Sequence, residues 1–531
     1  MKAKFFLMFA SAAMLLAACS KDDIGSGGDD SGIVTDPKGD AWVSLRVITP
    51  STRSTRALNS NPIKNATEAE SKIDNVRAIF FDADSDPLVT ADIALEPEQA
   101  GLVNDQFTER GEAFQVPATS KRILIVANPS SKFPSKESTP GKTYSWINEA
   151  IEEDASVISN ENGGFMMTNA KGGLEPSDSD GIDQDLTLYK TADFAESAPL
   201  SIKLDRVVAK VHVEIDPVVD AKTKAVVKLD DGGWHLNVTN KKYFPVSKRL
   251  PTWLEANGGG FRTPFDDYKL GSYRIDPNYD EQTQTSSDYN VYAEGDISTW
   301  NDNTKNEYCL ENTQDSINNV HAYTTHVLFK IKFIPTEYEL PGEQTEGAQG
   351  DDADWMYING GYYTFNTLKT WIETELTAKV NANGGVVSMP LTNAFNKYLG
   401  KDGLNIGEIS IPADKEGIEI AMGDFVTKQT VIQDMPDRAR TVGSFTYYVG
   451  GVCYYRAMIR HDDTDKIVNA LGEFGVVRNS YYDIFVSKFS RPGYPVIPEP
   501  SPEDPDEDDG NWLSIQINVN PWTWYKQVEE F

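Results

Sequence analysis

The residues that usually carry out catalysis or bind metals are scattered in this sequence. Of its five histidines, His321 and His326 are five residues apart, which suits neither the i,i+4 zinc pair of a helix nor one face of a strand. Residues 461–465 (HDDTD) follow a strand-like run and are typical of a polar turn. Residues 178–185 (DSDGIDQD) have the composition of a calcium loop but lack its glycine position and its bidentate glutamate. We therefore expect no metal and no cofactor.

Signatures of enzymes are also missing. Residues 140–143 (PGKT) lack the upstream glycine of a phosphate-binding loop. No nucleophile elbow occurs, and no carboxylate pair stands out from so acidic a background. The formal net charge of -32 argues against nucleic acid as a partner, because neutralising phosphates needs a basic face. The sequence predicts a protein that is not an enzyme.

The clearest chemical signal is a modification site near the start of the chain. Lys2 and Lys4 precede an apolar run too short to span a bilayer, and the run ends in Leu-Ala-Ala before Cys19. This pattern resembles a lipobox, in which Cys19 would be acylated, for example with palmitate, and become the new N-terminus; an ordinary signal peptide containing a cysteine is the alternative. We expect an outer-membrane lipoprotein precursor. Residues 20–23 (SKDD) resemble the export signal of Bacteroidales lipoproteins displayed on the cell surface.

Two cysteines remain after such processing, Cys309 and Cys453. Their spacing does not require a disulfide. Cys453 lies in an apolar, strand-like run (VCYYRAMI), which favours a buried free thiol. Whether the two cysteines pair stays open.

A short strand followed at once by two arginines marks the first part of the processed chain. Val43, Leu45 and Val47 alternate with the residues between them, as in a half-buried strand, and a proline ends the run. Ser-Thr-Arg then occurs twice, ending at Arg53 and Arg56. Solvated loop charge is the simplest interpretation of such a pair.

The rest of the chain predicts an all-β protein with a few short helices. Runs rich in Val, Ile, Thr and aromatic residues recur between Gly, Asn, Asp and Pro. A chain of 531 residues is too long for one ordinary core, so we expect two β-sandwich domains with a boundary near residues 216–223.

The C-terminal end has a different composition. Residues 491–511 are rich in proline and acids, which predicts an extended, self-repelling linker. After it, Leu513, Ile515, Ile517 and Val519 alternate strictly with polar residues, which predicts a strand. A strand on such an arm either closes its own domain or reaches another molecule.

Several segments together resemble the fimbrillins of Bacteroidales type V pili, in particular the major subunit of short fimbriae. The resemblance spans nearly the whole chain, although residues 218–340 match only patchily apart from 234–246 (WHLNVTNKKYFPV). The segments that carry it are FMMTNA (165–170), LSIKLDRVVAKVHVEI (200–215), CYYRAMIRHDD (453–463), FGVVRNSYYDIFVSKFSRPGYP (474–495) and the terminal LSIQINVNPWTWY (513–525).

This resemblance implies a domain plan and an assembly mechanism. An arginine-specific surface protease would cut after Arg56 or Arg53, the strand over residues 41–48 would leave with the lipid, and a donor strand from the next subunit would take its place. The donor would comprise Leu513, Ile515, Ile517, Val519 and Trp522. The implied plan is a signal peptide (1–18), a tether with the removed strand (19–56), two transthyretin-like sandwiches in tandem (57–216 and 217–490), a linker (491–511) and the donor (512–531).

The partners implied are further copies of the chain in a head-to-tail homopolymer, anchor and tip fimbrial subunits, the protease, and unknown receptors on host or bacterial surfaces. Two other interpretations stay open at this point. One is an accessory or tip adhesin of the same family. The other is a surface glycan-binding lipoprotein that stacks sugars on Trp300, Trp355, Tyr362 and Tyr363.

Overall fold

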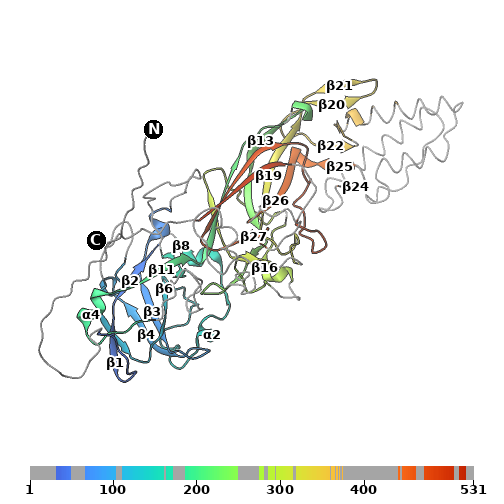
Figure 1. The fold of residues 1–531 in the computed structure, drawn as a ribbon. Coiled ribbons are helices and arrows are strands. Elements are labelled where there is room, and N and C mark those ends of the chain that lie inside the picture. Colours follow the sequence, from blue (N-terminus) through green and yellow to red (C-terminus); the bar gives the residue numbers. More distant parts are fainter. Residues whose placement is uncertain are drawn as a thin grey trace, which may run out of the picture.

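The computed structural model describes residues 32–49, 66–102, 111–160, 163–170, 186–219, 221–248, 274–279, 285–293, 295–314, 318–358, 360–364, 366–368, 370, 374, 441–442, 445–461, 472–506 and 513–521. These residues form mainly strands with a few short helices, so the all-β prediction is confirmed (Figure 1). Apolar side chains gather in two large clusters, which we call the first core and the second core.

The strands around the first core come from the N-terminal part of the chain. Their largest sheet has six strands in the order β2-β11-β10-β6-β3-β4, and β1 pairs separately with β5. The strands are β1 (Asp40–Val43), β2 (Leu45–Ile48), β3 (Val76–Phe81), β4 (Val89–Leu95), β5 (Phe114–Pro117), β6 (Arg122–Ala127), β7 (Ile151–Glu152), β8 (Ser159–Asn160), β9 (Gly164–Phe165), β10 (Met167–Asn169) and β11 (Leu200–Arg206).

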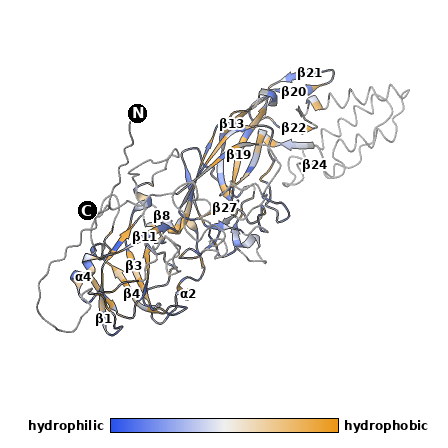
Figure 2. Ribbon diagram, viewed as in Figure 1, coloured by the Kyte–Doolittle hydropathy of each residue, from blue (hydrophilic) through white to orange (hydrophobic). Residues whose placement is uncertain are grey.

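The central strands β3 and β6 are apolar on both faces because both faces are covered. Ile79, Phe80, Leu124 and Ile125 have no exposed surface, although neighbouring residues on a strand point to opposite sides. Their continuous apolar runs, VRAIFF and RILIVA, are typical of strands buried on two sides. In Figure 2 such hydrophobic segments lie inside the molecule, where they fix the frame around β1 and β2.

The strands around the second core form several smaller sheets, including β17-β12-β28-β29 and β13-β19-β26. They are β12 (Val208–Ile215), β13 (Ala225–Asn237), β14 (Thr239–Asn240), β15 (Lys242–Tyr243), β16 (Tyr289–Asn290), β17 (Asn306–Leu310), β18 (Asn312–Thr313), β19 (His326–Pro335), β20 (Glu337–Leu340), β21 (Gln344–Gly347), β22 (Trp355–Ile358), β23 (Gly361–Tyr363), β24 (Thr441–Val442), β25 (Phe445–Tyr448), β26 (Val452–Met458), β27 (Gly475–Val476), β28 (Ser480–Phe489) and β29 (Leu513–Pro521).

The helices in the described part are short. They are α1 (Pro97–Ala100), α2 (Tyr144–Ile147), α3 (Ala155–Ile158) and α4 (Ala192–Ser197), with the 3-10 turns η1 (Ala69–Ser71), η2 (Ala221–Thr223), η3 (Ser286–Asp288) and η5 (Val449–Gly451). Within the described residues, no helix has the length and apolar composition needed to cross a bilayer.

The change from the first core to the second comes one strand earlier than predicted. β12 pairs with β17 in antiparallel and with β28 in parallel, and Ala209, Val211 and Val213 belong to the second core. The predicted boundary at residue 216 would leave β12 with the N-terminal sandwich. The reason is that β11 and β12 follow each other almost directly and have similar sequences. The strands with which they pair are what assigns them to different sheets.

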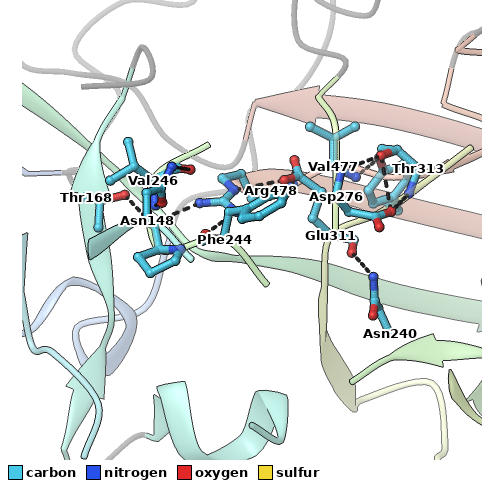
Figure 3. A network of polar contacts seen from close by, with 12 residues as sticks. Asn148, Thr168, Asn240, Phe244, Val246, Asp276, Glu311, Thr313, Val477 and Arg478 are labelled. Carbon is cyan, nitrogen blue, oxygen red and sulfur yellow. Dashed lines mark hydrogen bonds and ion pairs between the residues drawn. The ribbon is translucent and has the colours of Figure 1, made fainter. Parts of the chain in front are cut away.

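Buried polar contacts join the parts of the chain around the two cores (Figure 3). Arg478 donates from Nε to Glu311 (3.1 Å) and from its terminal nitrogens to the carbonyls of Phe244 (2.8 Å) and Pro245 (3.2 Å). From the other side, Thr168 donates to the carbonyl of Pro245 (2.9 Å). Both charged partners are almost fully buried, so that removing one would leave the other uncompensated. These contacts connect the part of the chain around the first core with the part around the second core.

The start of the acidic linker is packed, contrary to the picture of a free arm. Tyr494 forms a backbone bridge with Tyr454, and Val496 and Ile497 are buried. Farther along, Asp506 is buried, accepts a hydrogen bond from Thr324 Oγ1 (2.6 Å), and has its pKa raised to about 7 by burial. The apolar residues of the linker explain the difference, because Tyr494 and Ile497 pack in a small apolar cluster with Leu328 and Tyr454.

Candidate functional site

The first strand of the described chain serves two sheets. β1 pairs with β5 in antiparallel, whereas β2 pairs with β11 in parallel. Ser44 lies between the two strands, so that the segment Asp40–Ile48 crosses from one sheet to the other there. The sequence predicted one strand, and the structure divides it in two. The segment is therefore an integral part of both walls of the first core.

The burial predicted for the three apolar residues is confirmed, but Ser44 and Ile48, which the alternation places on the other face, are buried as well. Val43, Leu45 and Val47 are 0–1% exposed and belong to the first core, as does Ala41. Arg46, between them, is partly exposed. Full burial of such a side chain is worth about 1.5–3 kcal/mol, so these residues contribute strongly to the first core.

The surroundings of β2 fit its backbone closely. Gly101 and Gly111 lie against the carbonyl oxygen of Leu45, and a Cβ at either glycine would come within 2.3–2.4 Å of that oxygen. The buried Ser44 donates its hydroxyl to the carbonyl of Gly111 (2.7 Å). On the other side of β1, Trp42 exchanges two backbone hydrogen bonds with Tyr189. We call the surroundings made by β5, β11, Tyr189 and the two glycines the strand groove.

One residue of the segment is poorly satisfied. Thr49, directly after β2, is 1% exposed, and its hydroxyl has no hydrogen-bond partner among the residues that the structure describes. A buried hydroxyl without a partner destabilises the structure. Neither Thr49 nor the two glycines were recognised from the sequence, since no local pattern distinguishes them.

The chain on the far side of the two arginines is firmly held. Glu70 accepts hydrogen bonds from Lys210 Nζ (2.6 Å) and from the Tyr308 hydroxyl (2.6 Å), and its backbone carbonyl accepts from Arg206 Nε (2.8 Å). Burial acts to raise the pKa of Glu70, but the charge of Lys210 and the hydrogen bonds outweigh it and lower that pKa. Glu70 is thus fixed to β11, β12 and β17 by contacts in which the segment before the arginines takes no part.

The C-terminal strand is an edge strand of the second core. β29 pairs with β28 in antiparallel and closes the sheet β17-β12-β28-β29. Ile515 and Ile517 pack against the second core but stay partly exposed, and Gln516 is exposed. The predicted strand over residues 513–519 is confirmed as a strand, paired within its own chain.

Other predicted site residues fall outside the described residues. These are Cys19, Arg53, Arg56 and Trp522, and for Leu513 and Val519 the backbone alone is described. Cys309 and Cys453 are buried free thiols, as predicted for Cys453. Among the described residues no cluster of metal-binding side chains occurs.

Three of the four aromatic residues considered for sugar stacking are buried. Trp355 has no exposed surface and stacks on Tyr448, with ring centroids 4.1 Å apart. Tyr362 and Tyr363 are each 8% exposed. Trp300 is partly buried and packs beside Tyr454. Trp355 and Tyr362 belong to the second core, so these rings do not form a sugar-binding platform.

The fold and the strand groove define a β-sheet protein in which the first strand of the described residues completes a core. Two family models match the chain. Residues 41–179 match the major fimbrial subunit protein (FimA), and residues 446–528 match the C-terminal part of fimbrillin, the major fimbrial subunit protein type IV. No curated protein matches the chain.

Solved structures of low similarity cover most of the chain. A candidate cell adhesion protein from Parabacteroides distasonis is 12% identical, with coverage of 91% of this chain and 99% of that one and a TM-score of 0.42. A fimbrilin (fimA) from Porphyromonas gingivalis is 14% identical, with coverage of 92% and 99% and a TM-score of 0.38. The tip fimbrial protein Mfa3 from Porphyromonas gingivalis is 12% identical, with coverage of 91% and 100% and a TM-score of 0.30.

The two matching stretches lie in the first third and the last fifth of the chain, and both are similar to major fimbrial subunit proteins. Proteins of that description are structural subunits of cell-surface fimbriae.

Proposed function

We propose that this chain is the major, or stalk, subunit of a fimbria and that it polymerises by exchange of a strand after proteolysis. The precursor is exported as a lipoprotein through Cys19. An arginine-specific protease cuts after Arg56 or Arg53, the segment Asp40–Ile48 leaves the strand groove, and β29 of the next subunit replaces it. The result is a head-to-tail filament that supports adhesion and joins anchor and tip subunits.

The observation that carries this proposal is the position of the first strand. The segment Asp40–Ile48 pairs with strands of two different sheets around the first core. Both candidate arginines follow within eight residues of the end of this segment. The chain beyond them is held by contacts of Glu70 in which that strand takes no part. A cut between the two would leave the strand bound by non-covalent contacts alone, and its departure would leave an apolar groove and unpaired backbone groups to be covered.

A second observation favours β29 as the replacement. Ile515 and Ile517 are partly exposed in their present position, whereas the strand groove buries its occupants fully. Moving such side chains from a half-buried edge into a buried groove increases the apolar area removed from water. An open head-to-tail contact of this kind gives a filament and not a closed ring.

The test is N-terminal sequencing of the protein sheared from cells, beside the double variant Arg53→Ala/Arg56→Ala. We expect a mature chain that begins at Ser54 or Ala57, and a variant that stays a lipidated monomer. The wild-type filament should run as a ladder of multimers in SDS without heating. A mature chain that still begins at Cys19 would contradict the stalk proposal and favour a lipid-anchored adhesin or binding protein.

A further inference from the structure

The segment that fills the strand groove and the segment proposed to replace it resemble each other in sequence. Residues 42–47 read WVSLRV, and residues 512–517 read WLSIQI. Trp and Ser recur at the same spacing, and the other four positions differ by Val to Leu, Leu to Ile, Arg to Gln and Val to Ile. The two segments stand at opposite ends of the chain, around different cores.

We propose that β29 enters the groove of the next copy in the same direction as the resident strand, with Ser514 in the place of Ser44. This inference rests on the strand exchange proposed above, and it assigns the direction and register of the donor. We call this alignment the Ser44 register.

The inward positions of the groove support the Ser44 register. Val43, Leu45 and Val47 are the buried side chains of the resident strand, and the donor supplies Leu513, Ile515 and Ile517 in their places. Each exchange replaces one aliphatic side chain with another of equal or slightly larger size, a kind of change that cores tolerate well.

The buried serine distinguishes this register from its neighbour. The hydroxyl of Ser44 donates to the carbonyl of Gly111 in a fully buried corner, and Ser514 brings the same group there. A shift by two residues would put the larger Gln516 into that corner and overfill space that is already packed.

Thr49 gives independent support. Its buried hydroxyl has no partner, and in the Ser44 register Val519 takes its place. Valine has nearly the shape of threonine but no hydroxyl, so the donor removes an unsatisfied polar group that the resident strand carries. At this position the donor fits the groove better than the resident strand does.

The likeness has limits at two positions. Ala41 and Ile48 correspond to Asn511 and Asn518. Ile48 is buried but is not part of the first core, so a polar residue there does not enter that core. Ala41 is part of that core, beside the exposed Asp40 at the start of β1. The two segments therefore correspond at residues 42–47 and 512–517, and Val519 corresponds to Thr49.

The register can be measured with cysteine pairs across the groove. Arg46 lies opposite Ser201 on β11, and Ile48 lies opposite Lys203. In the Ser44 register, Gln516 then faces Ser201 and Asn518 faces Lys203 of the neighbouring copy. Gln516→Cys with Ser201→Cys, and Asn518→Cys with Lys203→Cys, should each convert the filament into a covalent ladder that disappears on reduction.

Two controls make the test specific. Asn518→Cys with Ser201→Cys reports the register shifted by two residues and should give no ladder. Gln516→Cys alone measures any background from Cys309 and Cys453, which are buried. Both matched pairs are needed, because an antiparallel donor could bring Gln516 to Ser201 but would not also bring Asn518 to Lys203.

The outcomes separate the register from the exchange itself. Covalent ladders from both matched pairs and none from the shifted pair support the Ser44 register. SDS-resistant multimers that form normally while either matched pair fails to crosslink would overturn the register and leave strand exchange standing. If the wild-type chain forms no such multimers, strand exchange fails and the register fails with it.

Discussion

The first and last strands of the described chain carry similar sequences but lie in different environments. The segment Asp40–Ile48 has a pairing partner on each side of β1 and two close glycines beside β2, and its residues Val43, Leu45 and Val47 are 0–1% exposed. β29 pairs on one side alone, with β28, and its central isoleucines stay partly exposed. The difference shows that the surroundings of each strand, and not its sequence, determine how deeply its side chains are buried. An exchange that moves β29 from its edge position into the strand groove would therefore lower the free energy.

The largest expected effect comes from shortening one apolar side chain in each strand. Leu45→Ala should destabilise the uncleaved chain by about 2–5 kcal/mol, because it leaves a cavity in a packed core. Ile517→Ala should cost less than half as much, since Ile517 is already partly exposed. Chemical denaturation of the two variants measures both values.

The comparison would fail if the two costs were equal. Equal costs would mean that β29 is held as firmly as β1 and β2, so that moving it into the strand groove would gain no free energy from burial. The same substitution can also be tested in the assembled filament. There, Ile517→Ala should speed dissociation of subunits, because the same side chain lies buried in the groove.

A smaller effect is expected from closing the space beside Leu45. Gly111→Ala places a Cβ 2.4 Å from the carbonyl of Leu45 and 2.8 Å from that of Gln99, so the backbone has to move, at a cost of about 1–3 kcal/mol. Gly347→Ala is the matched control, because its Cβ meets nothing within 4 Å. Thermal unfolding should separate the two variants. A Gly111 variant as stable as the control would show that β2 is loosely seated.

The smallest effect should be a gain. Thr49→Val removes a buried hydroxyl without a partner and should stabilise the uncleaved chain by about 1 kcal/mol. Thr49→Ser keeps the hydroxyl and loses a methyl group, so it should destabilise instead. Both are measured by denaturant titration. If the valine variant also polymerises more slowly after cleavage, release of the resident strand limits the rate of assembly.

Periodicity in the sequence was enough to place both strands. The alternation at Val43, Leu45 and Val47 predicted the buried face of the first strand, and that at residues 513–519 predicted β29. Such patterns are local, and they reflect the period-two geometry of any strand with one buried face. The same kind of reasoning predicted the buried thiol of Cys453.

Other features could not be predicted because they depend on residues far apart in the chain. The change of sheet at Ser44 follows from the positions of β5 and β11, and β12 belongs to the second core because it pairs with β28. The linker was expected to be a free arm, yet Val496 and Ile497 are buried. The composition of a segment predicts how that segment behaves alone. It does not show whether the rest of the folded chain has a surface on which the segment can pack.

The sequence by itself determined that the protein is built of strands, which faces of its first and last strands are apolar, and that residues at its two ends resemble fimbrillins. These properties depend on side-chain chemistry at a fixed backbone period. The tertiary structure alone decided that the first strand is shared by two sheets and fully buried while the last lies half-exposed at an edge. That distinction depends on how many neighbours the fold supplies to a strand, and those neighbours, such as β5 and β11, lie far from it in the sequence.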